Sequence, residues 1–174
     1  SSKDICMVEH VKDLIEAGVS SFKIEGRMKS ILYISSIVRA YRYVIDCILS
    51  GKPLDKMEQV YHELDVVSHR EFSTGFFYKK PWLDANIASS AEYKRNTRLA
   101  AMVLSTDEKV NLKIYNKITP NDKLVLIGKN MKTVPLGNIQ FFDKHGNPAT
   151  EAKHTEPFSA ILYDIDGNII KPEE

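Results

Sequence analysis

Residues 20–30 have the sequence SSFKIEGRMKS, and this stretch decides how the first half of the chain is expected to fold. The run 19–24, whose apolar residues are Val19, Phe22 and Ile24, is interpreted as a strand that is covered on both faces in a parallel sheet. Glu25, Gly26 and Arg27 follow at the carboxyl end of that strand, where α/β folds bind their ligands. Glycine permits a positive φ or a close backbone approach, and the planar guanidinium of arginine suits a carboxylate or a phosphate. The stretch therefore predicts an anion site in which Glu25 orients Arg27, and a purely structural Glu–Arg pair is the alternative.

Three helices are predicted around and after this strand. The first covers residues 5–17 with Asp4 as its N-cap, and the second covers residues 31–50 with Ser30 as its N-cap. A third helix is predicted over residues 54–67. Helical spacing places the apolar face of the second helix on Ile34, Ile37, Val38, Tyr41, Val44, Ile45 and Ile48. A helix–strand–helix unit of this kind is an α/β remnant, because it cannot close a sheet by itself.

The polar and aromatic segment 68–78 has neither the period of a strand nor that of a helix. In one interpretation His69 and Arg70 contact an anion while the phenyl rings of the segment stack on a nucleobase. In the other, the segment is an aromatic-rich loop that packs onto the domain, with Gly75 making the turn.

From Arg98 onward the chain becomes rich in β-forming residues. Runs of this kind lie at 99–104, 110–115, 123–127, 138–142 and 158–163, with Gly, Pro, Asn and Asp turn signals between them. Several short strands at this spacing predict a small antiparallel β-barrel. The expected organisation is an α/β segment over residues 1–80, a connector over 81–97 and a β-barrel domain over 98–174.

Composition restricts the function classes. The chain has 174 residues and a formal net charge of +1, so its bulk charge argues neither for nor against a nucleic-acid partner. Its two cysteines, Cys6 and Cys47, cannot by themselves ligate zinc or an iron–sulfur cluster and are expected to be free thiols in a reducing cytoplasm. No signal peptide or membrane-spanning apolar run is predicted. No GxSxG, HExxH, P-loop or dinucleotide-binding motif occurs, so the residues alone predict no metal site and no catalytic constellation.

Three stretches together resemble the C-terminal half of peptidase family U32, the collagenase-like proteases. They are SSKDICMVEHVKDLIEAGVSSFKIEGRMKS at 1–30, IVRAYRYVID at 37–46 and SHREFSTGF at 68–76. The motifs KIEGRMKS and HRxFSTGF are specific, and NKITPNDKLVLIG at 116–128 is similar to the β-domain that ends the members of this family.

The resemblance implies that residues 1–80 are the C-terminal segment of a catalytic domain that resembles a TIM barrel. Some members of the family hydroxylate RNA with an iron–sulfur cluster, and the branch that looks most similar hydroxylates the wobble uridine of tRNA with prephenate. The resemblance places a 4Fe–4S cluster in a preceding part of the whole protein, and Cys6 does not match its ligands. This chain alone is therefore expected to hold no cofactor and to be inactive.

The predicted function is that of the C-terminal part of a prephenate-dependent tRNA-hydroxylating enzyme whose β-domain positions the RNA. The alternatives are a collagenase-like protease and a non-catalytic structural or dimerisation domain. The candidate substrate- or anion-binding residues are Glu25, Gly26, Arg27, Lys29, His69 and Arg70. The expected partners are tRNA and prephenate, with a possible homodimer and no membrane, in the cytoplasm.

Overall fold

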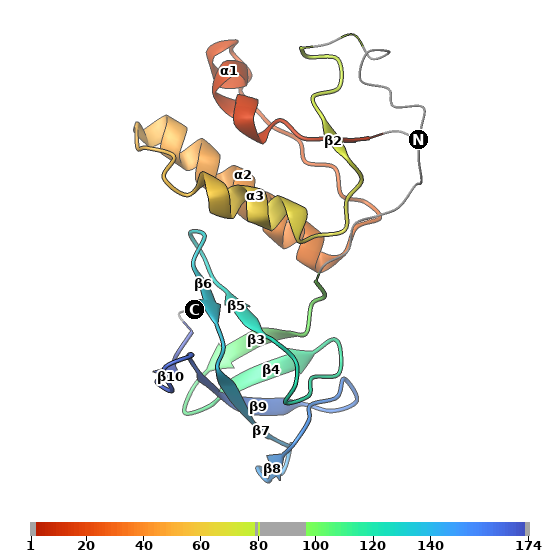
Figure 1. Cartoon of the computed structure of the whole chain (residues 1–174), viewed down its shortest axis with the longest axis vertical. Coiled ribbons are helices and arrows are strands. Elements are labelled where there is room, and N and C mark those ends of the chain that lie inside the picture. The colour runs from red at the N-terminus through yellow and green to blue at the C-terminus, as the bar shows by residue number, and fades with distance from the viewer. Residues whose placement is uncertain (1–2, 79, 81–96, 173–174) are drawn as a thin grey trace. The chain divides into compact units, whose positions relative to one another are not determined.

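The chain divides into two compact units, Ser1–Thr97 and Arg98–Glu174. A computed structural model describes residues 3–78, 80 and 97–172, which Figure 1 draws in colour. Most of the predicted connector, residues 81–96, lies outside the described residues. Helices together with mostly antiparallel strands make up the described fold.

The first unit combines helices with one short parallel ladder. Its elements are β1 (Asp4–Ile5), a 3₁₀-helix (Val8–His10), α1 (Val11–Glu16), α2 (Ile31–Ser50), α3 (Met57–Asp65) and β2 (Phe72–Ser73). β1 pairs with β2 in parallel, with Asp4 opposite Phe72 and Ile5 opposite Ser73. This ladder joins the beginning of the unit to the HRxFSTGF segment (Figure 1).

The predicted boundaries of α2 are confirmed, and capping residues at its two ends explain them. The Ser30 hydroxyl accepts a hydrogen bond from the Tyr33 backbone N–H at 3.1 Å, as an N-cap does. At the other end Gly51 adopts a φ of 67°, a left-handed conformation that glycine tolerates. The predicted cap at Asp4 is wrong, because Asp4 lies in β1 and the first α-helix begins only at Val11.

The strand predicted over residues 19–24 is not formed. Residues 19–26 have no regular secondary structure, and Val19 and Ile24 are exposed. An extended segment becomes a strand only through hydrogen bonds to a neighbour. The described residues supply no such neighbour for this run, so its apolar side chains remain uncovered.

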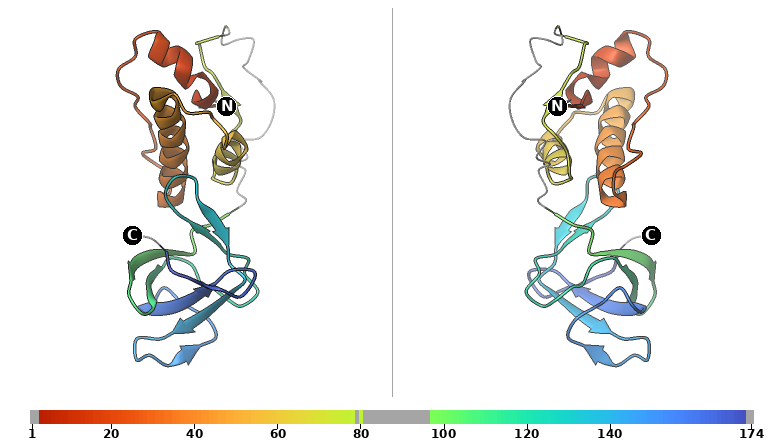
Figure 2. Two further views of the ribbon diagram at one scale, coloured as in Figure 1. Left: turned by 90° about the vertical axis from the view of Figure 1, so that its left-hand side faces the viewer. Right: turned by 90° about the vertical axis from the view of Figure 1, so that its right-hand side faces the viewer.

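The buried face of α2 lies beside the predicted one. Tyr33, Ile37, Ala40, Val44 and Cys47 are buried, whereas Ile34 and Val38 are 43% and 44% exposed. α3 runs alongside α2, and it contributes the buried side chains Val60 and Leu64 (Figure 2). The small Ala40 at the centre of this face permits close packing, and a pattern of large apolar residues does not reveal it.

The second unit is an antiparallel β-structure. Its strands are β3 (Ala101–Thr106), β4 (Val110–Ile114), β5 (Val125–Ile127), β6 (Thr133–Pro135), β7 (Asn138–Phe142), β8 (Pro148–Ala149), β9 (Phe158–Tyr163) and β10 (Ile169–Ile170). The main sheet has the order β3–β4–β9–β7–β8, β10 pairs with β9, and β5 and β6 form a separate ladder. The predicted antiparallel strands are therefore present, but the ladders do not close into a barrel over the described residues.

One face of this sheet forms the hydrophobic core of the unit. Along β4 and β9 every second residue is buried: Val110, Leu112 and Ile114 on β4, and Phe158, Ala160 and Leu162 on β9. Such period-two burial is expected of a sheet with one covered face. The intervening residues point to the opposite face, called here the outer face.

Two loops of the sheet are built alike. Residues 143–147 (DKHGN) join β7 to β8, and residues 164–168 (DIDGN) join β9 to β10. In each loop the aspartate Oδ1 accepts two backbone N–H hydrogen bonds at 2.8–2.9 Å, and the glycine has a φ of 82° or 84°. This is the arrangement of a three-residue hairpin loop with a glycine bulge. Turns were predicted at both of these twin loops, but the sequence did not predict that the two loops share one hydrogen-bond pattern.

Candidate functional site

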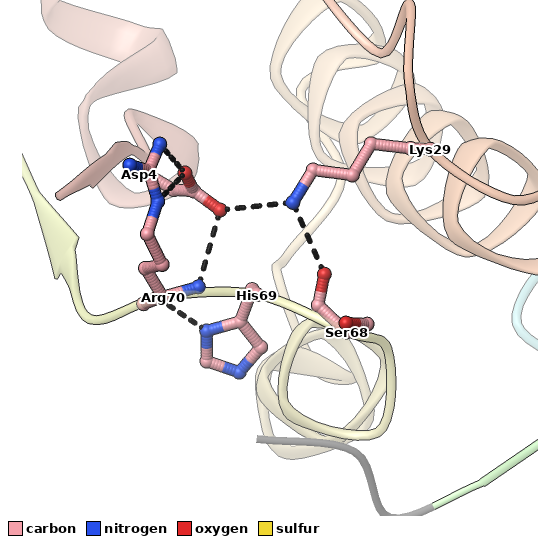
Figure 3. A network of polar contacts seen from close by, with 5 residues as sticks. All are labelled: Asp4, Lys29, Ser68, His69 and Arg70. Carbon is pink, nitrogen blue, oxygen red and sulfur yellow. Dashed lines mark hydrogen bonds and ion pairs between the residues drawn. The ribbon is translucent and has the colours of Figure 1, made fainter. Parts of the chain in front are cut away.

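The Asp4 carboxylate holds together residues from three separate parts of the first unit (Figure 3). Its Oδ1 accepts hydrogen bonds from Arg70 Nε at 3.0 Å and from Arg70 Nη2 at 2.7 Å. Its Oδ2 accepts from the Arg70 backbone N–H and from Lys29 Nζ, both at 3.2 Å. Lys29 also donates to the Ser68 carbonyl at 3.1 Å. We call Asp4, Lys29 and Arg70 the Asp4 cluster.

The Asp4 cluster joins one carboxylate to an ammonium and a guanidinium group. Burial is the largest single effect on the pKa of Asp4 and raises it, but the hydrogen bonds from Arg70 and Lys29 together outweigh burial and lower this pKa. The carboxylate is therefore ionised at neutral pH. The side chains of Lys29 and Arg70 are 20% and 29% exposed, so solvent reaches both cations.

The neighbouring His69 is buried and is held in place by contacts within the first unit. Its ring is buried, stacks on Phe72 with centroids 4.1 Å apart, and has Nδ1 2.6 Å from the Arg70 carbonyl. Nε2 lies 3.6 Å from Asp65 Oδ1. Stacking and the Nδ1 contact fix the backbone of Arg70, so we assign His69 to positioning Arg70 in this cluster.

The predicted residues Glu25 and Arg27 lie outside the Asp4 cluster. Both side chains are exposed, and the ion pair of Glu25 is with Lys23, at 3.7 Å. The turn they belong to is connected to Lys29 through the backbone, because the Lys29 N–H donates to the Gly26 carbonyl at 2.9 Å. Arg27 and Lys29 are only two positions apart, but Lys29 lies in the Asp4 cluster and Arg27 lies on the surface.

Gly26 has a different role from the predicted one. It does not adopt a positive φ. A Cβ added there would instead lie 3.2 Å from Ile34 Cγ1, at the first turn of α2. The glycine therefore permits the close approach of this turn to α2, and the strained-turn explanation is wrong.

The structure bears on the second interpretation of the segment 68–78, that of a loop packed onto the domain, and agrees with it in part. Gly75 makes a turn with a φ of 61°, as predicted. Phe76 and Phe77 are 79% and 61% exposed, so these rings do not pack onto the described part of the unit. A hollow of about 390 Å³ next to the segment is lined by Cys6, Glu9, His10, Tyr61, Phe72 and Thr74, among others.

The described residues do not fit a metal or cluster site. No group of three or more His, Cys, Asp and Glu side chains among them converges as metal ligands would. A cubane cluster takes four cysteine thiolates, and this chain has two cysteines. Cys47 is buried on α2, and Cys6 lies 3.7 Å from the hydroxyl of Tyr41. None of the described helices has the length and apolar content needed to cross a bilayer.

Asp4 is the member of the cluster that sequence reasoning missed. The only sequence signal was the SKD phrase before an apolar run, which is also the signature of a helix cap. Its pairing with Arg70 depends on the parallel β1–β2 ladder, which brings together residues 66 positions apart. Chemically, the Asp4 cluster holds an ammonium and a guanidinium group beside β1, and groups of these types bind carboxylates and phosphates.

Comparison with known proteins gives the family. Residues 1–86 match the sequence model of peptidase family U32. The chain belongs to this family through these residues. No solved structure matches the chain significantly.

Three relatives extend over both units. The tRNA hydroxylation protein P1 of Bacillus subtilis (strain 168) is 29% identical over 173 residues, covering 97% of this chain and 40% of the relative. The uncharacterized protease MJ0090 of Methanocaldococcus jannaschii is 33% identical, covering 74% of this chain and 33% of the relative. The tRNA hydroxylation protein P of Escherichia coli (strain K12) is 31% identical, covering 83% of this chain and 31% of the relative. The chain thus spans between 31% and 40% of the length of these relatives.

Proposed function

We propose that this chain is the C-terminal part of an RNA-hydroxylating enzyme, with tRNA as the substrate and its wobble uridine as the modified base. The observation that carries the proposal is the similarity to the tRNA hydroxylation protein P1, which runs through both units with few residues left out. A second relative with a tRNA hydroxylation name also matches most of the chain. A match confined to the first unit would support only a shared fold of that unit. A match that also covers the β-unit supports the proposal that the β-unit has the same role in this protein as in the tRNA hydroxylation protein P1.

In this proposal the first unit completes a catalytic domain that resembles a TIM barrel. The exposed apolar side chains of the first unit, among them Ile24, Ile34 and Val38, support a larger domain that covers them. A 4Fe–4S cluster would be held by cysteines outside this chain, because the two cysteines here do not fit one. We therefore assign no chemical step to an iron–sulfur cluster. The location that we propose for the protein in the cell is the cytoplasm.

The residues proposed to bind substrate are the candidates on and next to the Asp4 cluster. Arg27 and Lys29 would hold a carboxylate of prephenate or a phosphate of RNA, while Arg70 is fixed by Asp4. In the full-length enzyme Arg27→Lys removes the bidentate fork and should weaken function by ~1–3 kcal/mol. Wild-type levels of modified tRNA in that variant would remove Arg27 from the proposed site.

The test of the proposed function is mass-spectrometric nucleoside analysis of tRNA from cells that lack the full-length gene. Loss of a hydroxylated wobble uridine, with restoration by the gene, is the expected result. Depletion and resupply of prephenate in the same cells tests the proposed co-substrate. Unchanged tRNA nucleosides in the deletion strain would contradict the proposal.

Peptide cleavage is a second candidate, because one relative is named an uncharacterized protease. A cleavage assay on the full-length protein, with chelator and inhibitor controls, separates it from RNA hydroxylation. Turnover of a collagen-derived peptide that disappears with Arg27→Lys would favour the protease. The homodimer proposed from exposed apolar side chains is tested by sedimentation velocity over a range of concentrations.

A further inference from the structure

We propose that the outer face of the β-unit sheet binds a single-stranded segment of RNA, with Phe142 as a stacking platform for a base and Lys109 and Lys113 as phosphate contacts. The inference rests on the proposed function, because it names the surface on which the RNA substrate would be held. It concerns only the second unit and is independent of the Asp4 cluster.

The outer face is continuous across three neighbouring strands. Asn111 on β4 and Phe142 on β7 both lie opposite Ser159 of β9, so the three residues form one row. In the adjacent rows Gln140 lies opposite Ile161, and Tyr163 lies opposite Asn138. Two strand spacings separate β4 from β7, which makes the row about 10 Å wide. The small Ser159 at its centre leaves the flanking side chains accessible.

Two lysines already lie against aromatic rings at this face. Lys109 Nζ is 3.4 Å from the centroid of the Phe142 ring, and Lys113 Nζ is 5.2 Å from that of Tyr115. A lysine side chain has a flexible stem, so an arriving phosphate can draw the ammonium off the ring. The uncovered ring can then stack on the base attached to that phosphate. The lysine and the ring thus offer the two contacts that one nucleotide needs.

The outward positions of β4, β7 and β9 carry a lysine and no acid, while Asp107 and Glu108 border the face at the β3–β4 turn. Asp143 and Asp164 follow β7 and β9, but their carboxylates accept backbone N–H groups within the twin loops. Asp107 lies at the β3–β4 turn, next to the Ser105 and Asn111 side chains. Exposed amides of Asn138 and Gln140 add donors and acceptors for base edges.

The same composition argues against a protein as the occupant. The cores of protein–protein interfaces are depleted in lysine. Lysine next to aromatic rings and amides is instead the composition of surfaces that bind single-stranded nucleic acid. Phe142 is only half-buried although it is a large aromatic residue, so its ring contributes little to the core of the unit.

The experiment is a fluorescence-anisotropy titration of the whole 174-residue chain with a labelled single-stranded RNA 12-mer, repeated at several salt concentrations. Phe142→Leu keeps an apolar side chain but removes the ring, and it should weaken binding about fivefold or more. Phe142→Tyr keeps the ring and should retain the wild-type affinity. Lys109→Gln should lower the slope of log affinity against log salt by about 0.7.

A matched control removes the same charge elsewhere. Lys153 pairs with Glu151 at 2.7 Å and lies on none of the strands of the face, so Lys153→Gln should leave the affinity unchanged. Three results would overturn the inference: equal affinities for Phe142→Leu and wild type, equal losses for Lys109→Gln and Lys153→Gln, or a duplex bound as tightly as the single strand. Concentration-dependent self-association that Phe142→Leu abolishes would assign the face to a second copy of the chain and would also overturn it. Circular dichroism checks that each variant is folded.

The failure of this inference can be distinguished from failure of the proposed function. If the deletion strain keeps its hydroxylated uridine while the anisotropy results are as expected, the function is wrong and the RNA-binding face stands. If the gene restores hydroxylation but Phe142→Leu binds the 12-mer like wild type, the function stands and the inference is wrong.

Discussion

The two units of this chain are stabilised in different ways. The first unit buries apolar side chains such as Val11, Val44 and Val60, joins distant segments by polar contacts such as that of Asp4 with Arg70, and leaves many large apolar side chains exposed. The second unit buries a contiguous apolar core under one face of its sheet. The two units differ in their polar contacts between distant segments and in their exposed large apolar side chains, which among the described residues are more numerous in the first unit. Substitutions of core residues should therefore be costly in either unit, whereas substitutions of single paired charges should affect the first.

The largest effect is expected from Phe158→Ala in the β-unit. Phe158 is buried and meets Phe141 edge to face with ring centroids 6.4 Å apart, so truncation should cost about 3–5 kcal/mol. Urea unfolding followed by hydrogen exchange on peptides from each unit measures the loss separately. The control is Phe77→Ala in the first unit, which removes an equally large but 61% exposed ring and should cost less than about 0.5 kcal/mol. If Phe158→Ala and Phe77→Ala lose equal free energies of unfolding, the described contrast between the buried and the exposed ring is wrong.

The next largest effect is expected from Asp4→Asn in the first unit. The substitution leaves the half-buried Arg70 and Lys29 without their carboxylate, and a lost hydrogen bond to a charged group costs about 1.5–3 kcal/mol. Hydrogen exchange should rise in β1 and β2 and stay constant in the β-unit. Asp46→Asn, which removes an exposed carboxylate paired with Arg42 on α2, is the control and should change stability by less than about 0.5 kcal/mol. If Asp4→Asn is as mild as Asp46→Asn, the Asp4 cluster does not stabilise the fold.

A pair of glycine substitutions gives a smaller contrast. A Cβ at Gly137 would lie 2.3 Å from the Asp164 carbonyl oxygen, so Gly137→Ala must shift backbone and should cost about 1–3 kcal/mol. A Cβ at Gly26 would lie closest to the exposed side chain of Ile34, which can move, and in ordinary contact at 3.9 Å with Tyr33 Cε1, so Gly26→Ala should cost less than about 0.5 kcal/mol. Thermal unfolding of both variants tests the ranking. A larger loss at Gly26 than at Gly137 would contradict the ranking and would show that the turn cannot move away from α2.

The smallest effect is a pH dependence of the β-unit. Hydrogen bonds within the twin loops, chiefly from Asn147 and Asn168, lower the pKa values of Asp143 and Asp164. The ammonium groups of Lys117 and Lys153 lower the pKa of Glu151 to about 2. The unfolded chain therefore binds more protons than the folded one between about pH 4.5 and pH 2, and stability falls as the pH decreases through that range. Because these groups are exposed, 1 M salt should shrink the effect for Glu151, and the variant Glu151→Gln should flatten the acid limb of the melting curve.

The sequence predicted several elements from local signals, but it missed β1 and β2, whose partners are distant, and also the short hairpin strands β6, β8 and β10. α2 was placed correctly because Ser30 and Gly51 act within one turn of its ends. β7 and β9 were placed at their exact bounds, because alternation and flanking turn residues define them. The two-residue strands β1 and β2 were missed because their pairing depends on residues far apart in the chain.

The candidate site was likewise predicted only in part from the sequence. Lys29 and Arg70 were proposed as site residues from their types, and the structure brings both to Asp4. Their common partner could not be predicted, because an aspartate before an apolar run has the same local signature in a helix cap and in a strand. Residue type alone likewise did not indicate that His69 is buried against Phe72.

The twin loops have a practical consequence for engineering this chain. Each loop aligns a strand of only two residues, β8 or β10, with its longer partner, so the loop and not the strand sets the hairpin register. An affinity tag or reporter peptide inserted between Asp143 and Asn147, or between Asp164 and Asn168, would detach the short strand from its partner. Tags are better tolerated at exposed positions that define no register, and the DKHGN and DIDGN sequences can be exchanged between the two hairpins without changing either strand pairing.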